Sequence, residues 1–526
     1  MSHIGKPPCD EGAILHGAPV SPCTAAARRW TLVAAIVGSS MAFIDGTVAN
    51  VALPAIQRDL NASASEAQWV IESYALFLAA LLLVGGALGD RLGRRRVFMV
   101  GVGFFTAASV ACALSVSANQ LIIARAVQGV GAALLVPGSL SLISGAFPKR
   151  ERGRAIGTWS GFSGIAAAVG PVVGGFLIDH YDWTWAFLVN VPFGVVLLTL
   201  CAFKVPESRS VSAAQRVDGQ GALLATLGLA GIVYAFIEAP ALGWAAAAVV
   251  IAALVGAGGL MLFVYVEARS RSPMLPLKLF RKRNFAGANL LTLLLYAALG
   301  GGLYFLPLNL IQVQHYGATA AGAALLPFIA IMFLLSRWAG KLTDTLGSKI
   351  PLVAGPAIAA VGFASFALPS VGGSYWMTFF PAVCILGLGM AVTVAPLTTT
   401  VMNAVDSDLA GVASGVNNAV SRAAALLAIA VFGLVMAGAF DATLGRSLSS
   451  VHAPAEVLNA LQDQRHKLAA IDIPRGVDEP TASAVKQVVG QAFVAGFRRV
   501  MLLCAALATL SALSAWLLIE GKPRRW

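Results

Sequence analysis

The chain has 526 residues, of which 58% are hydrophobic and only 11% are charged. A soluble chain of this length would carry about a quarter of its residues as Asp, Glu, Lys or Arg, so the composition excludes a string of soluble domains and predicts a membrane protein. The net charge of +12 does not indicate nucleic-acid binding, because the basic residues lie in short loops between apolar segments.

The first 27 residues contain four prolines and no apolar core. Residues 1–27 are therefore expected to form a disordered cytoplasmic tail and not a signal peptide. After this tail, apolar runs recur at the length of about 20 residues that a bilayer core about 30 Å thick requires. We predict an all-α, polytopic membrane protein with fourteen transmembrane helices. They lie at residues 30–52, 67–89, 96–117, 120–143, 155–178, 184–203, 220–240, 244–266, 285–310, 320–340, 350–368, 374–400, 409–438 and 498–519.

The distribution of Lys and Arg predicts the orientation of these helices. With the N-terminus in the cytoplasm, the inward loops hold basic runs such as residues 94–96 and 281–283, whereas the short outward loops hold only Arg58. An even number of helices then returns the C-terminus to the cytoplasm. A long outer loop is expected at residues 439–497, and within it residues 456–462 have an amphipathic pattern.

Asp45 lies inside the first apolar segment, in the string Asp-Gly-Thr-Val-Ala-Asn-Val-Ala-Leu-Pro. A charged Asp at the centre of a membrane helix costs about 2.5 to 3.5 kcal/mol, so it should face protein or water and is a functional candidate by default. Arg125, in the predicted helix 120–143, lies at a similar depth. We expect Asp45 to take up and release a coupling proton and Arg125 to tune it. The alternative is a structural ion pair that locks two helices.

Glu72 lies near the outer end of the predicted helix 67–89. It is a second candidate proton carrier, because an acid inside a membrane helix is costly without a function. The alternative is an interfacial Glu that reaches water among the lipid headgroups.

A cytoplasmic loop at residues 86–96 has the sequence Gly-Ala-Leu-Gly-Asp-Arg-Leu-Gly-Arg-Arg-Arg. The glycines permit a tight helix–loop–helix connection, and its Asp can cap the next helix or pair with the arginines. If the pairing crosses the interface between the two halves, the loop would act as a latch that holds the outward-open state. The alternative is topogenic charge alone. The predicted latch residues are Gly86, Asp90, Arg91, Gly93, Arg94 and, in a second copy of the pattern, Asp344.

The second copy, at residues 340–349, lies eight predicted helices after the first. A duplicated six-helix unit would place it six helices later, so two helices are inserted between the halves. We predict an N-terminal half at 28–205, two inserted helices within 206–268, and a C-terminal half at 269–526.

The predicted helix 155–178 is rich in glycine and contains a proline. Pro removes a backbone hydrogen bond and Gly provides room, so this helix is expected to bend and to pack against the other half. The alternative is generic small-residue packing. The residues concerned are Gly157, Gly170, Pro171, Gly174 and Gly175.

Polar and aromatic residues inside the apolar segments are candidates for a central cavity. Arg422 lies near the middle of helix 409–438, where it either binds anionic groups, contributes to gating, or is a structural Arg bonded to carbonyls. Glu238 is expected to be an interfacial residue. The predicted substrate-cavity residues are Asn50, Tyr296, Tyr304, Asn309, Met390, Thr393 and Arg422.

These motifs together resemble those of the major facilitator superfamily, in its fourteen-helix drug:proton antiporter branch of the EmrB/QacA type. The resemblance rests on the string that begins at Asp45, on Arg125-x-x-Gln128-Gly129, on the loop at 86–96, and on Gly-Pro-x-x-Gly-Gly at 170–175. Ala166, where relatives often have Gly, is a departure from it.

The resemblance implies a proton-coupled antiporter that exports amphipathic, often cationic drugs or toxic compounds by alternating access. Its expected partners are the lipid bilayer, protons and small amphipathic substrates, and a periplasmic adaptor with an outer-membrane channel is left open. The expected location is a bacterial cytoplasmic membrane. An exporter of the same fold that is dedicated to one antibiotic or metabolite is the alternative.

Other classes have little support. Gly-Phe-Ser-Gly at residues 161–164 faintly resembles the serine motif of intramembrane proteases, but it overlaps the glycine-rich helix and the nearest histidine, His180, is interfacial. There is no phosphate-binding Gly-x-x-x-x-Gly-Lys motif and no Cys pair with zinc spacing. A receptor or scaffold function would not explain the two duplicated halves. We therefore expect no enzyme, no cofactor and no metal.

Overall fold

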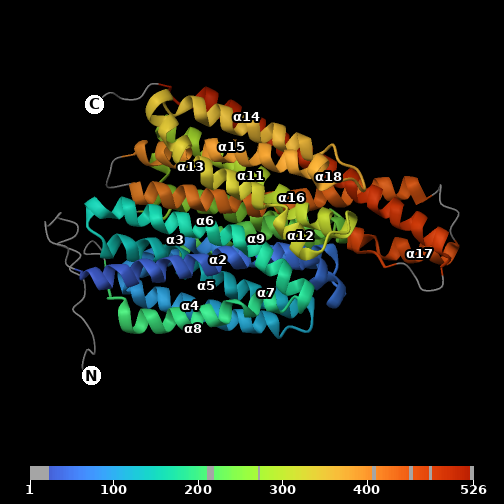
Figure 1. Cartoon of the computed structure of the whole chain (residues 1–526), viewed down its shortest axis with the longest axis horizontal. Coiled ribbons are helices and arrows are strands. Elements are labelled where there is room, and N and C mark those ends of the chain that lie inside the picture. Colours follow the sequence, from blue (N-terminus) through green and yellow to red (C-terminus); the bar gives the residue numbers. More distant parts are fainter. Residues whose placement is uncertain are drawn as a thin grey trace. The chain divides into compact units, whose positions relative to one another are not determined.

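The computed structural model describes residues 23–209, 218–270, 273–405, 410–448, 454–472 and 477–521. These residues form helices and connecting segments, and none of them lies in a β-strand (Figure 1). Fourteen of the described helical segments are long and apolar enough to cross a membrane. The predicted all-α fold with fourteen spans is confirmed.

Most spans are single helices, and three are interrupted. The sixth, ninth and tenth spans each combine two consecutive elements. In chain order the spans are α2 (Ala25–Asp59), α3 (Ala64–Leu92), α4 (Arg94–Ala113), α5 (Ala118–Ala146), α6 (Lys149–His180), α7 (Trp185–Leu188) with α8 (Asn190–Lys204), α9 (Gly219–Leu242), α10 (Ala247–Arg269), α11 (Arg283–Leu308) with η2 (Asn309–Val313), α12 (Ala318–Ala323) with α13 (Leu326–Leu346), α14 (Lys349–Phe366), α15 (Tyr375–Asn403), α16 (Ala410–Leu448) and α18 (Glu479–Leu518). Three short elements are η1 (Leu277–Arg281), α17 (Ala455–Asp463) and η4 (Arg465–Ala470).

The structure corrects two expected boundaries. Helix α2 begins at Ala25, inside the expected tail 1–27, of which residues 1–22 lie outside the described part. The expected loop 439–497 is largely helical where it is described, because α16 continues to Leu448 and α18 begins at Glu479. The amphipathic pattern at 456–462 belongs to α17.

The early start of α18 has a local cause. The Asp478 side chain caps the helix by accepting a hydrogen bond from the backbone N–H of Thr481 at 3.1 Å, and its bonds from Thr481 hold the pKa of the Asp478 carboxyl below its usual value. Val485 and Val489 are buried, whereas Lys486 is exposed. The first half of α18 is therefore amphipathic. Its mean hydropathy is too low for it to be recognised as a membrane span from apolar residues alone.

The chain forms two compact units, and their bounds differ from those of the predicted halves. The first unit ends its first segment at Ala49 and also contains residues 73–229 and 258–276. The second contains residues 50–72, 230–257 and those from 277 onward. The two inserted helices, α9 and α10, each contribute to both units.

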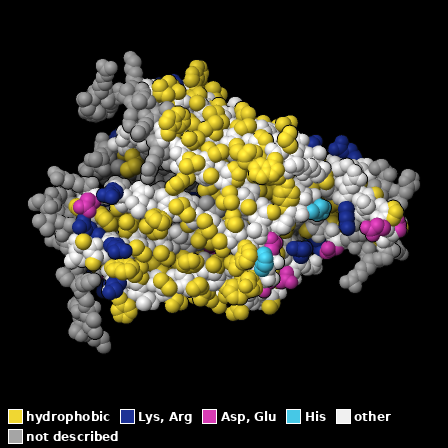
Figure 2. Space-filling view, in the orientation of Figure 1, with side chains coloured by type: hydrophobic (Ala, Val, Ile, Leu, Met, Phe, Trp, Pro, Cys, Tyr) yellow, Lys and Arg dark blue, Asp and Glu magenta, His cyan; other side chains and the backbone are white. Residues whose placement is uncertain are grey.

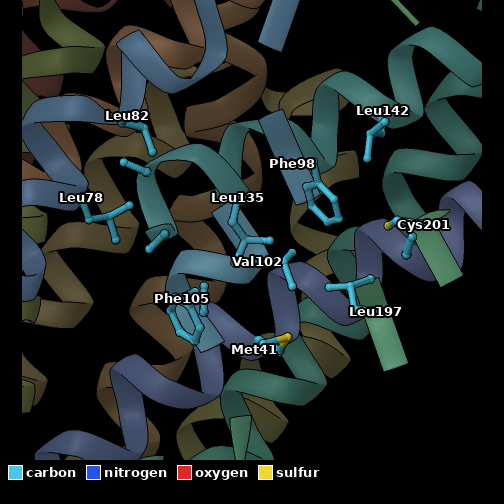
Figure 3. Close-up of a cluster of buried hydrophobic side chains, with 14 of the residues drawn as sticks. Met41, Leu78, Leu82, Phe98, Val102, Phe105, Leu135, Leu142, Leu197 and Cys201 are labelled. Atoms are coloured by element: carbon cyan, nitrogen blue, oxygen red, sulfur yellow. The ribbon is translucent and has the colours of Figure 1, made fainter. Parts of the chain in front are cut away.

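The core of the first unit is a cluster of buried side chains from α2, α3, α4, α5 and α8 (Figure 3). Phe98 and Phe105 of α4 are fully buried there beside Leu135 of α5. A Cβ atom at Gly131 of α5 would lie 2.6 Å from the backbone nitrogen of Phe105, so the two helices pack with their backbones in contact. Small residues allow this approach in membrane helices, where lipid supplies no hydrophobic drive for association.

The second unit packs by the same means. Helix α14 packs against α15 and α18, and α11 packs against α16 and α18 (Figure 1). A Cβ at Gly389 of α15 would lie 2.5 Å from the backbone nitrogen of Ala359 of α14. Large hydrophobic side chains remain exposed along the helices, as in the face shown in Figure 2. This is expected of a surface solvated by lipid.

Candidate functional site

The first unit buries an ion pair. Arg125, on α5, donates from Nη1 to Oδ2 of Asp45, on α2, at 2.6 Å. The two side chains are 1% and 0% exposed. The structure therefore brings together the two residues that the sequence placed at similar depth. A buried charge is tolerated when it is paired and its remaining acceptors are satisfied.

Two amides satisfy the other oxygen of the Asp45 carboxylate. Gln128 donates from Nε2 to Oδ1 at 2.7 Å, and Asn190 donates from Nδ2 to the same atom at 3.0 Å. Oε1 of Gln128 accepts a bond from Arg125 at 2.6 Å, and the Ser109 hydroxyl accepts from both amides. The carboxylate thus accepts three hydrogen bonds from two other helices, α5 and α8.

Aromatic rings flank the guanidinium. The Cζ atom of Arg125 lies 4.2 Å from the ring centre of Tyr74 on α3 and 5.5 Å from that of Phe187 on α7. These distances allow cation–π attraction, which is stronger where water is excluded. The rings therefore hold the guanidinium in place while they separate it from solvent.

Sequence reasoning missed some members of this network. Gln128 follows Arg125 by three residues, so helical geometry places both side chains on one face. Asn190 was detectable as an amide inside an apolar segment, at the break between α7 and α8. Its role as a donor to Asp45 could not be predicted, because the two residues are 145 positions apart in the sequence.

Glu72 belongs to the second unit. Its side chain is 0% exposed, and neither carboxylate oxygen has a hydrogen-bond partner among the described residues. The interfacial alternative is therefore wrong, because that alternative requires contact with headgroup water. Tyr304 of α11 lies within electrostatic range of this carboxyl group. An unpartnered carboxylate buried in protein is costly, so the group is suited to holding a proton.

The loop between α3 and α4 holds its charges in local contacts. Asp90 accepts a bond from Nε of Arg94 at 2.8 Å, so it pairs with an arginine within the same unit. Gly86 lies close to Pro137 of α5, and Arg91 is exposed. Asp344 lies in α13, but its side chain is outside the described residues.

The cap of α4 is provided by Glu207, which sequence reasoning missed. Its carboxylate accepts hydrogen bonds from the backbone N–H groups of Arg95 at 2.9 Å and Arg96 at 3.2 Å. Gly93 has φ 117°, and a Cβ there would lie 2.9 Å from this carboxylate. Glycine is therefore required at position 93 for its backbone conformation and for space. The carboxylate also lies favourably at the positive end of the helix dipole.

The glycines of α6 contact α2. A Cβ at Gly174 would lie 2.5 Å from the Val48 side chain, and one at Gly170 would collide with Thr47. These two glycines pack against α2 within the first unit, and the expected packing of α6 against the other half stays a prediction. Gly157 has open space around it. Pro171 and Gly175 are buried inside α6.

The second unit contains a cavity of about 410 Å³. Of the predicted cavity residues, Tyr304 lies in its wall, and the other six are not among the described wall residues. Asn309, Met390 and Thr393 are buried elsewhere in this unit, and the Thr393 hydroxyl donates to the carbonyl of Gly389 at 2.7 Å. The other three, which are partly buried, are Asn50, Tyr296 and Arg422.

Comparison with known proteins identifies the family. Residues 35–429 match the Major Facilitator Superfamily. The multidrug resistance protein Stp of Mycobacterium tuberculosis is 33% identical over 92% of this chain and 91% of its own length. The tetracenomycin C resistance and export protein of Streptomyces glaucescens is 30% identical over 94% and 93%. A crystal structure of a bacterial homologue of the human lysosomal transporter Spinster shares the fold, with a TM-score of 0.61 at 17% identity, covering 95% of this chain and 98% of that one. This chain belongs to the Major Facilitator Superfamily of membrane transporters.

Proposed function

We propose that the chain is a proton-coupled antiporter that exports amphipathic, often cationic drugs or toxic compounds by alternating access. Membership of the superfamily and the fourteen spans support transport across a bilayer. Relatives named for multidrug resistance and for antibiotic export support the outward direction and the substrate class. The membrane is a bacterial cytoplasmic membrane with both chain termini on the cytoplasmic side.

The buried Asp45–Arg125 pair carries the proposal of proton coupling. A proton on Asp45 neutralises the charge that attracts the guanidinium and removes an acceptor that the donors now use. Proton uptake therefore requires Arg125, Gln128 or Asn190 to move. Because these side chains come from α5 and from the start of α8, protonation changes how helices of the first unit pack. Such a change is what links a proton to alternating access.

The remaining site residues have supporting roles in this proposal. Glu72 is a second proton acceptor, supported by its burial without hydrogen-bond partners among the described residues. The contacts of Asp90 with Arg94 and of Glu207 with the start of α4 form the latch that stabilises one conformation. The glycines of α6 let that helix move against α2 at close range.

A narrower substrate range is the alternative within the same fold. The relative from Streptomyces glaucescens is named for one antibiotic, tetracenomycin C. An exporter dedicated to a single antibiotic or metabolite would use the same proton site. Testing several unrelated amphipathic compounds on one preparation separates the two possibilities, because a dedicated exporter would respond to one of them only.

Substrate-induced proton release from the purified protein tests the proposal. Tetraphenylphosphonium added to the unmodified protein in weakly buffered detergent solution should release protons, and Asp45→Asn should reduce that release about tenfold or more. Glu479→Gln is a matched control, because it neutralises an exposed carboxylate at the start of α18. Folded Asp45→Asn protein with undiminished release would refute the role of Asp45.

A further inference from the structure

We propose that the cavity in the second unit binds amphipathic cations, and that the inserted helix α9 forms one wall of this site. The inference rests on the proposed export function, since it locates a site for the substrate of that transport. It is separate from the Asp45 network, because every wall residue belongs to the second unit.

The size and the apolar part of the wall suit a small amphipathic molecule. A cavity of about 410 Å³ lies within the usual range for small-molecule sites, which is about 300 to 1,000 Å³. Tyr304 of α11 and Phe493 of α18 contribute aromatic rings, and Ile237 of α9 contributes an aliphatic face. Aromatic faces attract organic cations through their quadrupole in addition to providing apolar contact.

Hydrogen bonds hold amide groups in the same wall. Gln312, in η2, donates from Nε2 to Oε1 of Gln57 at 2.8 Å. Gln68 of α3 donates from Nε2 to the carbonyl of Ile429 at 2.9 Å. All three amides line the cavity. They provide oriented dipoles for the polar part of a ligand without the cost of ordering mobile side chains on binding.

The wall carries two carboxylates that can pair with a cation. Asp441 and Asp463 line the cavity together with Arg465 and Lys467. The Lys467 ammonium is engaged elsewhere, because it donates to Asn61 at 2.7 Å and lies 3.9 Å from a carboxylate oxygen of Asp472. Neither of these two partners is among the wall residues. The wall thus holds two carboxylates together with the Arg465 guanidinium, the His466 imidazole and the Lys467 ammonium. The two carboxylates are the groups that can pair with a cationic ligand.

Glu72 provides a third acidic group in this part of the second unit. It follows Gln68 by one helical turn on α3, and it lies within electrostatic range of Tyr304. Its carboxyl has no hydrogen-bond partner among the described residues. When it is ionised, it contributes a further negative charge near the cavity, which a cationic ligand would offset.

The inserted helix is fixed against this site by specific contacts. Trp69 of α3 donates from Nε1 to Glu238 of α9 at 2.8 Å, and its ring lies 6.1 Å from that of Tyr234. Glu238 thus has a defined partner, although the sequence suggested only an interfacial residue. Trp69 directly follows the wall residue Gln68, and Glu238 directly follows the wall residue Ile237. The contact therefore links two residues that adjoin the cavity wall in sequence. A change on α9 should therefore act directly on binding.

Equilibrium binding to full-length protein in lipid nanodiscs, without a proton gradient, tests the site. Radiolabelled tetraphenylphosphonium is the cation, and triphenylphosphine oxide is the neutral comparison. Asp441→Asn should weaken binding of the cation about fivefold and leave the neutral compound unchanged, because it removes one partly solvated charge. Ala241→Phe should weaken both about tenfold or more, because its ring fills cavity space at the α9 wall.

Leu242→Phe is the matched control, because Leu242 is the next residue on α9, is 51% exposed and does not line the cavity. It should bind like the unmodified protein. Unchanged binding in both Asp441→Asn and Ala241→Phe, or no binding of the cation by the unmodified protein, would overturn the site. If both variants weaken binding but the cation releases no protons from unmodified protein, the site is supported and proton-coupled export is refuted.

Discussion

Replacing Asn190 by Leu tests whether the network around Asp45 sets its affinity for the proton. The substitution removes one of the two amide donors to Oδ1 and keeps the bond from Arg125 to Oδ2. A hydrogen bond to a charged group contributes about 1.5–3 kcal/mol. At about 1.4 kcal/mol for each tenfold change, its loss disfavours the ionised carboxylate about tenfold to hundredfold. The pH profile of substrate-induced proton release should therefore move upward by about one to two pH units.

The assay measures tetraphenylphosphonium-induced proton release from purified protein across a series of pH values. Thr199→Val is the control, because Thr199 lies on the same helix, is exposed and bonds only to the carbonyl of Val195 in its own helix. Its profile should match that of the unmodified protein. An unshifted profile in folded Asn190→Leu protein would refute the idea that the amide donors stabilise the ionised form. A shift to lower pH would do so as well.

Three further predictions concern other parts of the molecule. Glu72→Gln should leave the protein folded and lower the number of protons released for each substrate; an unchanged ratio would contradict a proton-carrying role. Gly174→Leu should collide with Val48 and lower stability by about 1–3 kcal/mol, seen as a lower Tm and lost transport, whereas Gly157→Leu should be tolerated because that position is open. Glu207→Gln should weaken the cap of α4 and cost about 1 kcal/mol. Thermal unfolding in detergent checks this cost, and an unchanged Tm would argue against the cap.

The sequence alone determined the class of fold and the number of spans. Bilayer thickness sets the length of an apolar helix, so fourteen runs of the right length could be counted without knowledge of their packing. The same reasoning selected Asp45, because the cost of a charge in lipid depends on its residue type and depth alone. Arg125 could be assigned as its partner because both residues lie at similar depth.

The tertiary structure decided what surrounds these residues. Asn190 donates to a carboxylate 145 positions away, and Glu207 caps a helix that begins 113 positions before it. Glu72 proved to be fully buried, although its place near a helix end suggested contact with water. The first half of α18 escaped prediction because its polar face lowers its mean hydropathy. Hydropathy and depth follow from local sequence, whereas burial, capping and hydrogen-bond partners depend on which distant segments pack together.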